Sequence, residues 1–208
     1  INNIYNVNRL SLDNSYESGE SLTVGINFKK EKIIVENEID SIEEYLDFRL
    51  ATVFRVVEEK NIPSKSTLNK KNSNIFGQLN YKPTEIFSLD YSFSLKDNLE
   101  TFEYNSLNAK LDYENFSTQF NFLEEKGAIG QTNVIENITK YNFNKENALS
   151  FKTRKNRNLN LTEYYDLLYE YKNDCLTAGI QYKKNYYSDA DIKPVEELLF
   201  NITIVPSI

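Results

Sequence analysis

Apolar and polar residues alternate one by one along most of this chain, and this pattern limits the fold more than any other feature. The alternation is clearest from Phe87 to Leu95, where Phe, Leu and Tyr interleave with Ser and Asp. A period of two puts successive side chains on opposite faces of a β-strand. About eleven such segments lie between residues 21 and 205, and the only helical signal is a short turn at 39–46. The pattern predicts an all-β, antiparallel fold.

The connections between these segments alternate in length. Residues 188–195 and 157–162 form long connections, whereas 172–174 and 143–147 form short ones. Short turns on one rim and long loops on the other are typical of an outer-membrane β-barrel, with the short turns on the periplasmic side. The connection predicted at 30–44 breaks the series, because it is long where a short one is expected. The series still favours a transmembrane barrel.

The two faces of the predicted strands differ in charge. One face consists of Leu, Phe, Ile, Tyr and Val with almost no charge, and we expect it to meet lipid. The other face carries full charges, which imply a wide, hydrated lumen because the interior of a small barrel is filled with packed side chains. The residues expected to face that lumen are Arg49, Arg55, Asp112, Arg154 and Glu170. No stretch approaches the roughly 20 apolar residues of a membrane-spanning helix.

Three other protein classes are compatible with parts of this pattern. A soluble antiparallel β-sandwich or β-solenoid that serves as a binding module would also alternate, because one face meets a core and the other meets water. A porin-like channel would share the barrel and its loops. A carboxylate-based hydrolase built into a barrel is disfavoured because the chain contains no His. The alternating connection lengths favour the barrel over the soluble sheet.

The composition excludes several functions. A net charge of −7 argues against a nucleic-acid partner, whose binding surface is basic. With no His and one Cys, the chain cannot assemble the usual zinc, haem or iron–sulfur ligand sets, nor a His-based catalytic group. We therefore expect no cofactor and no metal, and any catalysis would have to rest on carboxylates.

The chain begins at Ile1 and contains no Met, so we expect it to be part of a longer protein. An odd number of strands leaves the two ends of the sheet on opposite rims, whereas bacterial single-chain barrels close with even numbers. We expect one partial barrel domain over residues 1–208, with residues 1–20 as an extracellular loop, that does not close by itself.

Three segments resemble segments of a known family that occur in the same order. A tyrosine-rich run comprises Tyr164, Tyr165, Tyr169, Glu170, Tyr171, Lys172, Asn173, Asp174, Cys175, Leu176, Gly179, Tyr182 and Tyr187, and is followed by Ser188, Asp189, Asp191, Ile192, Lys193 and Pro194. Near the start lie Asn8, Arg9, Asp13, Glu17 and Gly19, and further on lie Ile62, Pro63, Ser64, Leu68 and Ser73. Together they resemble the C-terminal barrel region of the lipopolysaccharide-assembly family LptD. Leu10 and Leu12 depart from the family's first loop motif.

This resemblance implies a function in the outer membrane of a Gram-negative bacterium, where the family inserts lipopolysaccharide into the outer leaflet. It implies a conduit and not an enzyme. It implies an LptE-like plug lipoprotein in the lumen and a periplasmic lipopolysaccharide bridge that acts through an N-terminal domain absent from this chain. It also implies that Cys175 forms a disulfide with that N-terminal region. Asn8, Arg9 and Asp13 would order an extracellular loop. The last strand would flank the lateral gate and comprises Glu196, Leu198, Phe200, Ile202 and Ile204.

Overall fold

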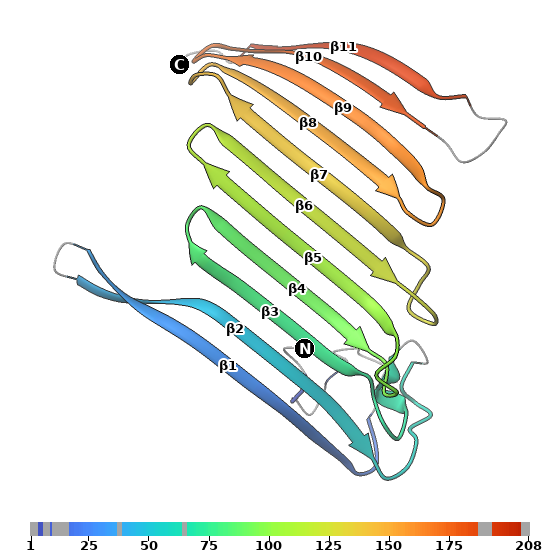
Figure 1. The fold of residues 1–208 in the computed structure, drawn as a ribbon. Helices are drawn as coiled ribbons and strands as arrows, with labels where there is room; N and C mark the ends of the chain where they lie inside the picture. The colour runs from blue at the N-terminus through green and yellow to red at the C-terminus, as the bar shows by residue number, and fades with distance from the viewer. Residues whose placement is uncertain are drawn as a thin grey trace. The chain divides into compact units, whose positions relative to one another are not determined.

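Eleven strands in one antiparallel sheet form the fold of this chain in a computed structural model, with a single 3-10 turn as the only helical element among the described residues. The structure describes residues 4–5, 9, 17–36, 39–63, 66–186 and 193–204. The strand order follows the sequence, from β1 at one end of the sheet to β11 at the other (Figure 1). The prediction of an all-β, antiparallel fold is confirmed.

The elements have the following bounds. The strands are β1 (Ser21–Glu36), β2 (Ile39–Arg55), β3 (Ile75–Thr84), β4 (Phe87–Leu95), β5 (Phe102–Tyr113), β6 (Phe116–Glu125), β7 (Asn133–Asn142), β8 (Asn147–Asn156), β9 (Leu161–Lys172), β10 (Leu176–Asn185) and β11 (Val195–Ile204), and the 3-10 turn η1 is Thr67–Asn69. Among the described residues β1 pairs only with β2, and β11 only with β10. The sheet therefore ends in two edge strands and does not close, as expected.

The first hairpin corrects two expectations. The long connection predicted at 30–44 and the helical turn at 39–46 are both absent, because β1 continues to Glu36 and β2 begins at Ile39. The β-branched residues of this region favour a strand. The alternation was obscured by a register shift: Lys30 lies opposite Leu46 while Glu31 lies opposite Glu44, so that Tyr45 is an extra residue in β2. Such a β-bulge changes which residues share a face.

The segment around Val134 lacks regular alternation, because Ile135 and Ile138 have opposite parity and point to opposite faces of β7. Ile138 lies opposite Lys152 and shares the charged face of β8, whereas Ile135 lies opposite Lys155 on the other face. The segment is a strand although its alternation is broken, because both of its neighbours in the sheet pair with it.

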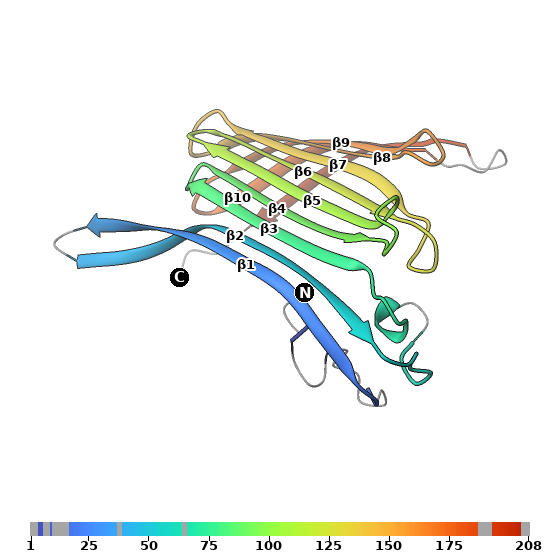
Figure 2. The same cartoon turned by 60° about the horizontal axis from the view of Figure 1, so that its bottom comes forward.

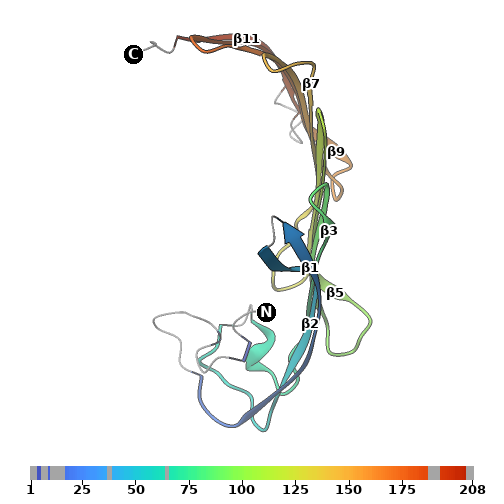
Figure 3. The same cartoon turned by 90° about the vertical axis from the view of Figure 1, so that its left-hand side faces the viewer.

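The chain groups into two compact units within the sheet. The first consists of Ile1–Thr84, Ser88–Leu107 and Glu124–Gln131, and the second of Glu85–Phe87, Asn108–Leu123 and Thr132–Ile208. In the first unit, η1 and its loop lie over one face of β1 and β2 (Figure 3). Beneath them is a small core made of Ile4, Ala51, Val53, Ile62 and Leu68.

Candidate functional site

A row of opposite charges crosses the last four strands in register. Lys152 lies opposite Asp166, Asp166 opposite Lys183, and Lys183 opposite Glu197. Residues that are directly opposite in a sheet project from the same face, so the row alternates positive and negative along one surface. Gln181 adds to it, because its side-chain amide donates to both carboxylate oxygens of Asp166 at 2.8 and 2.9 Å.

A chain of polar side chains continues from this charged face in the second unit. The amide of Asn108 donates to the Asn121 side chain at 2.5 Å, and Asn121 donates to Glu136 at 3.1 Å. The hydroxyl of Tyr164 donates to the other oxygen of Glu136 at 2.7 Å. Glu136 lies opposite Arg154, which in turn lies opposite Tyr164. Many polar side chains of this face therefore form hydrogen bonds with their neighbours. The face carries amide, hydroxyl and charged groups together.

The opposite face of the same strands is apolar and exposed. Leu167 lies opposite Tyr182, and Ile180 opposite Phe200. Leu167 is 40% exposed, Ile180 46% and Phe200 68%, and among the described residues of this unit only Val134 and Ala148 are buried apolar side chains. A water-soluble sheet covers its apolar face with another layer. Here the described part of the chain supplies no such cover.

The last strand presents its expected residues on a single face. Glu196, Leu198, Phe200, Ile202 and Ile204 lie opposite Lys184, Tyr182, Ile180, Ala178 and Leu176, respectively. Glu196 forms an ion pair with Lys184. The four apolar residues are exposed, up to 74% at Ile204. The strand is therefore an edge with an apolar face and one charged end.

The five residues expected to face the lumen lie on several strands, and each forms an ion pair or hydrogen bond with a nearby side chain or lies on the charged face of its strand. Arg49 and Arg55 project from the same face of β2, and Arg154 and Glu170 share the charged face of β8 and β9. Arg49 donates to Asp47 at 3.1 Å. Arg154 forms a 2.8 Å ion pair with Glu163. The remaining residue, Asp112, pairs with Lys110 on its own strand at 2.5 Å.

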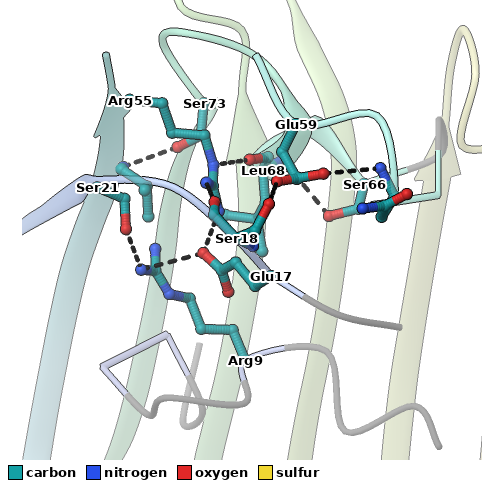
Figure 4. A network of polar contacts seen from close by, with 11 residues as sticks. Arg9, Glu17, Ser18, Ser21, Arg55, Glu59, Ser66, Leu68 and Ser73 are labelled. Carbon is teal, nitrogen blue, oxygen red and sulfur yellow. Dashed lines mark hydrogen bonds and ion pairs between the residues drawn. The ribbon is translucent and has the colours of Figure 1, made fainter. Parts of the chain in front are cut away.

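Arg55 has a different environment from the others, because its side chain is buried in a polar network in the first unit (Figure 4). Its guanidinium forms an ion pair with Glu17, donates to the carbonyl of Leu68 at 2.6 Å and donates to the carbonyl of Ser18 at 3.0 Å. Arg9 approaches the same Glu17 carboxylate at 3.1 Å. The network ties the segment before β1 to the end of β2.

Glu59 forms the second half of this network. Its carboxylate accepts the hydroxyl of Ser18 and, at 3.0 Å, the backbone N–H of Asn61. These hydrogen bonds, that of Ser18 above all, hold the pKa of Glu59 below its ordinary value of 4.5, because they stabilise the ionised form. Glu59 and Ser18 carry no pattern that sequence reasoning could have used, since they lie in connections without periodicity.

The covered surface of β1 and β2 also contains a glycine, Gly25, whose small size is needed there. Gly25 lies opposite Ala51, and a Cβ at Gly25 would lie 1.8 Å from the Tyr5 hydroxyl and 2.5 Å from the Leu50 carbonyl oxygen. Glycine is therefore required for the segment that contains Ile4 and Tyr5 to approach the sheet so closely. The charged face of β2 carries Ala51 and Val53 between Arg49 and Arg55. That interruption was the available sign that this face is covered.

Cys175 lies in the turn between β9 and β10 as an exposed free thiol. Its backbone N–H donates to the side chain of Asn173 at 3.0 Å within the turn. The chain contains no second Cys. Other family-like residues lie outside the described part of the chain, namely Asn8, Asp13, Ser64, Tyr187, Ser188, Asp189, Asp191 and Ile192, as do the departing residues Leu10 and Leu12.

Within the described ranges, no three His, Cys, Asp or Glu residues are grouped so as to hold a metal ion. No helix in that part of the chain is long and apolar enough to cross a membrane.

No family model matches the chain, and none of the curated proteins matches its sequence.

Proposed function

We propose that this chain is part of an outer-membrane β-barrel of the LptD type, which passes lipopolysaccharide to the outer leaflet of a Gram-negative bacterium. The observation that carries the membrane part of the proposal is the exposed apolar face of β8–β11. Leu167, Ile180 and Phe200 lie on this face, opposite a face of paired charges. Lipid is an environment in which an antiparallel sheet keeps such a face without a covering layer.

The chemistry of lipopolysaccharide has two parts that correspond to the two faces. Its acyl chains are apolar, whereas its sugars and phosphates are polar and charged. The charged face, with Lys152, Gln181 and Lys183 beside Asn121 and Tyr164, offers donors to hydroxyl and phosphate groups. A wall of this kind suits the passage of sugars through water. It needs no catalytic group, so we assign the chain a conduit function.

The edge strand β11 supports the lateral part of the proposal. An exposed edge with Leu198, Phe200, Ile202 and Ile204 on one face is the place at which a sheet opens toward lipid at the lowest cost in ladder hydrogen bonds. We propose that acyl chains leave the barrel along this strand.

The resemblance supplies the proposed partners. An LptE-like plug lipoprotein would contact the charged face, and the periplasmic lipopolysaccharide bridge would act through an N-terminal region of such a protein. The exposed thiol of Cys175 is accessible for a disulfide with that region in the oxidising periplasm.

Depletion of the complete gene product from growing cells tests the transport proposal. Newly made lipopolysaccharide, pulse-labelled and assayed at the cell surface, is expected to fall in proportion to the protein. The assembly of an unrelated outer-membrane barrel, measured in the same cells, controls for general damage to the envelope. Surface lipopolysaccharide that stays at its normal level during depletion would remove the transport function.

A further inference from the structure

The first hairpin extends past the rest of its unit as a two-stranded arm, made of residues 31–36 of β1 and 39–44 of β2. β2 pairs with β3 from Leu46 to Ala51, whereas β1 and β2 continue to pair up to Glu36 and Ile39. Figure 2 shows the blue hairpin running beyond the end of β3. The arm therefore carries two strand edges that pair with no other strand within the described residues.

Two local features release the arm from the sheet. The bulge at Tyr45 lies at the point where pairing with β3 stops. Pro83 of β3, two residues beyond the last paired residue Tyr81, has no N–H with which to extend the ladder. The end of this pairing is thus built into the sequence at both strands.

In the arm the apolar residues are no longer confined to the face of Phe28, because Ile34 lies on that face opposite Ser41, whereas Ile33 and Ile42 do not. Ile33 and Ile42 lie directly opposite each other, on the face that carries Lys29 and Asp47 in the body of the hairpin. They are 72% and 71% exposed. The other face continues that of Phe28, and in the arm it carries the 3.0 Å ion pair of Lys32 with Glu43. An ion pair is costly on a face that meets lipid, so its position on the face of Phe28 indicates that the arm extends beyond the apolar environment.

The charges of the arm divide between its base and its tip. At the base, Lys29 pairs with Glu44 at 2.5 Å, and Lys82 approaches Glu43 at 3.6 Å. Residues 33–42 contain four Ile, one Val, two Glu and one Asp, and no basic residue. An isolated two-stranded hairpin is only marginally stable in water. The ion pairs at the base fix the arm to the sheet, while Ile33 and Ile42 are exposed in a segment that contains acidic but no basic residues.

We propose that this arm is a docking element for a protein partner with an apolar depression surrounded by basic residues. The depression would receive Ile33 and Ile42. The basic rim would face the acidic tip, where the side chain of Asp40 is exposed. The negative charge of the arm disfavours two other binding partners. An anionic membrane surface and the acidic arm of a second copy of this chain would both repel the arm. The proposal relies on the proposed function only for the side of the membrane on which the partner lies.

A photo-crosslinking amino acid placed singly at Ile33, Ile42 or Ser41 of the full-length protein in cells tests this docking. Ser41 is the matched control, because it is exposed, is adjacent to Ile42 and projects from the other face. We expect positions 33 and 42 to crosslink to one protein, at a site where Lys or Arg residues surround apolar ones, and Ser41 to give little product. Asp40→Lys is expected to lower the yield about tenfold through like-charge repulsion.

Each other result overturns the docking proposal. The absence of a crosslinked product at positions 33 and 42, or equal crosslinking yields at positions 33 and 41, would do so. Crosslinks to lipid or to a second copy, or to a protein site without basic residues, would also overturn it. So would a crosslinking yield that Asp40→Lys leaves unchanged. Heat-modifiable migration of every variant confirms that the barrel is folded. Because the readout does not involve lipopolysaccharide, a failure here is distinct from a failure of the depletion experiment.

Discussion

The loop-covered end of β1–β2 and the bare strands β8–β11 use the same alternating pattern in opposite ways. On β2, Val53 is completely buried and Arg55 lies in a network beneath the segment before β1. On β8–β11, the charged side chains pair with one another in register, and apolar residues such as Leu167 remain exposed. Alternation thus defines two faces but does not determine what covers them. In the first region the chain covers one face itself, and in the second the described residues leave the apolar face exposed.

The largest expected effect comes from the buried ion pair of the covered end. Arg55→Ala leaves Glu17 with only Arg9 and removes the donor to the carbonyls of Leu68 and Ser18. The loss of one partner of a buried pair costs about 3–5 kcal/mol. Amide hydrogen exchange at residues 53–73 should report this loss. Arg154→Ala is the matched control, because its ion pair with Glu163 is 40% and 30% exposed, and it should cost about 1 kcal/mol or less. Equal effects at the two arginines would contradict the comparison.

The next prediction compares the two faces of a single strand. Leu167 lies on the apolar face of β9, and Leu168 lies on the charged face opposite Gln181. If the apolar face meets lipid, Leu167→Arg should lower the stability in phospholipid vesicles by about 2–4 kcal/mol for a position near the membrane midplane. Leu168→Arg should have little effect, since it adds a cation beside Asp166 and Glu170. Urea titration of the vesicle-inserted protein measures both, and a larger loss at Leu168 would argue for a water-soluble sheet.

A smaller effect distinguishes two glycines that lie in paired strands. Gly25→Ala would force Tyr5 away from the sheet, because the new Cβ has no space beside the Tyr5 hydroxyl and the Leu50 carbonyl. Such overpacking costs about 1–3 kcal/mol. At Gly179 the nearest atom to a new Cβ is a flexible Leu168 methyl at 3.3 Å. Gly179→Ala should therefore be close to neutral. Thermal unfolding of the two variants tests the difference, and an equal loss at both positions would contradict it.

The smallest effect is a local dependence on pH. The folded-state pKa of Glu59 is lower than the unfolded value, so its ionised form stabilises the network above the ordinary value of 4.5. That contribution should be lost as the pH falls below 4.5 through the depressed folded pKa. Protease cleavage of the loop at 56–74 should accelerate over this range, and Glu59→Gln should be cleaved readily at every pH. A cleavage rate in the parent protein that does not change with pH would exclude this contribution of Glu59.

Sequence reasoning recovered the strands but misjudged the first hairpin. Regular alternation, as from Phe87 to Leu95, identifies a strand because burial or lipid contact on one face enforces a period of two. Near Tyr45 one extra residue interrupts the period of two. The sequence alone does not show which of the two paired strands contains this extra residue. The same limit applies to Ile135 and Ile138, whose faces were assigned only through pairing with β8.

The sequence by itself determined that this protein is an antiparallel sheet with one charged and one apolar face, because those properties follow from residue spacing along each strand. Only the tertiary structure decided how the strands align, and hence that Lys152, Asp166, Lys183 and Glu197 form one row. It also decided that Arg55 is buried while Arg154 is partly exposed. The physical reason is that both outcomes depend on contacts between residues distant in sequence, which local periodicity does not encode.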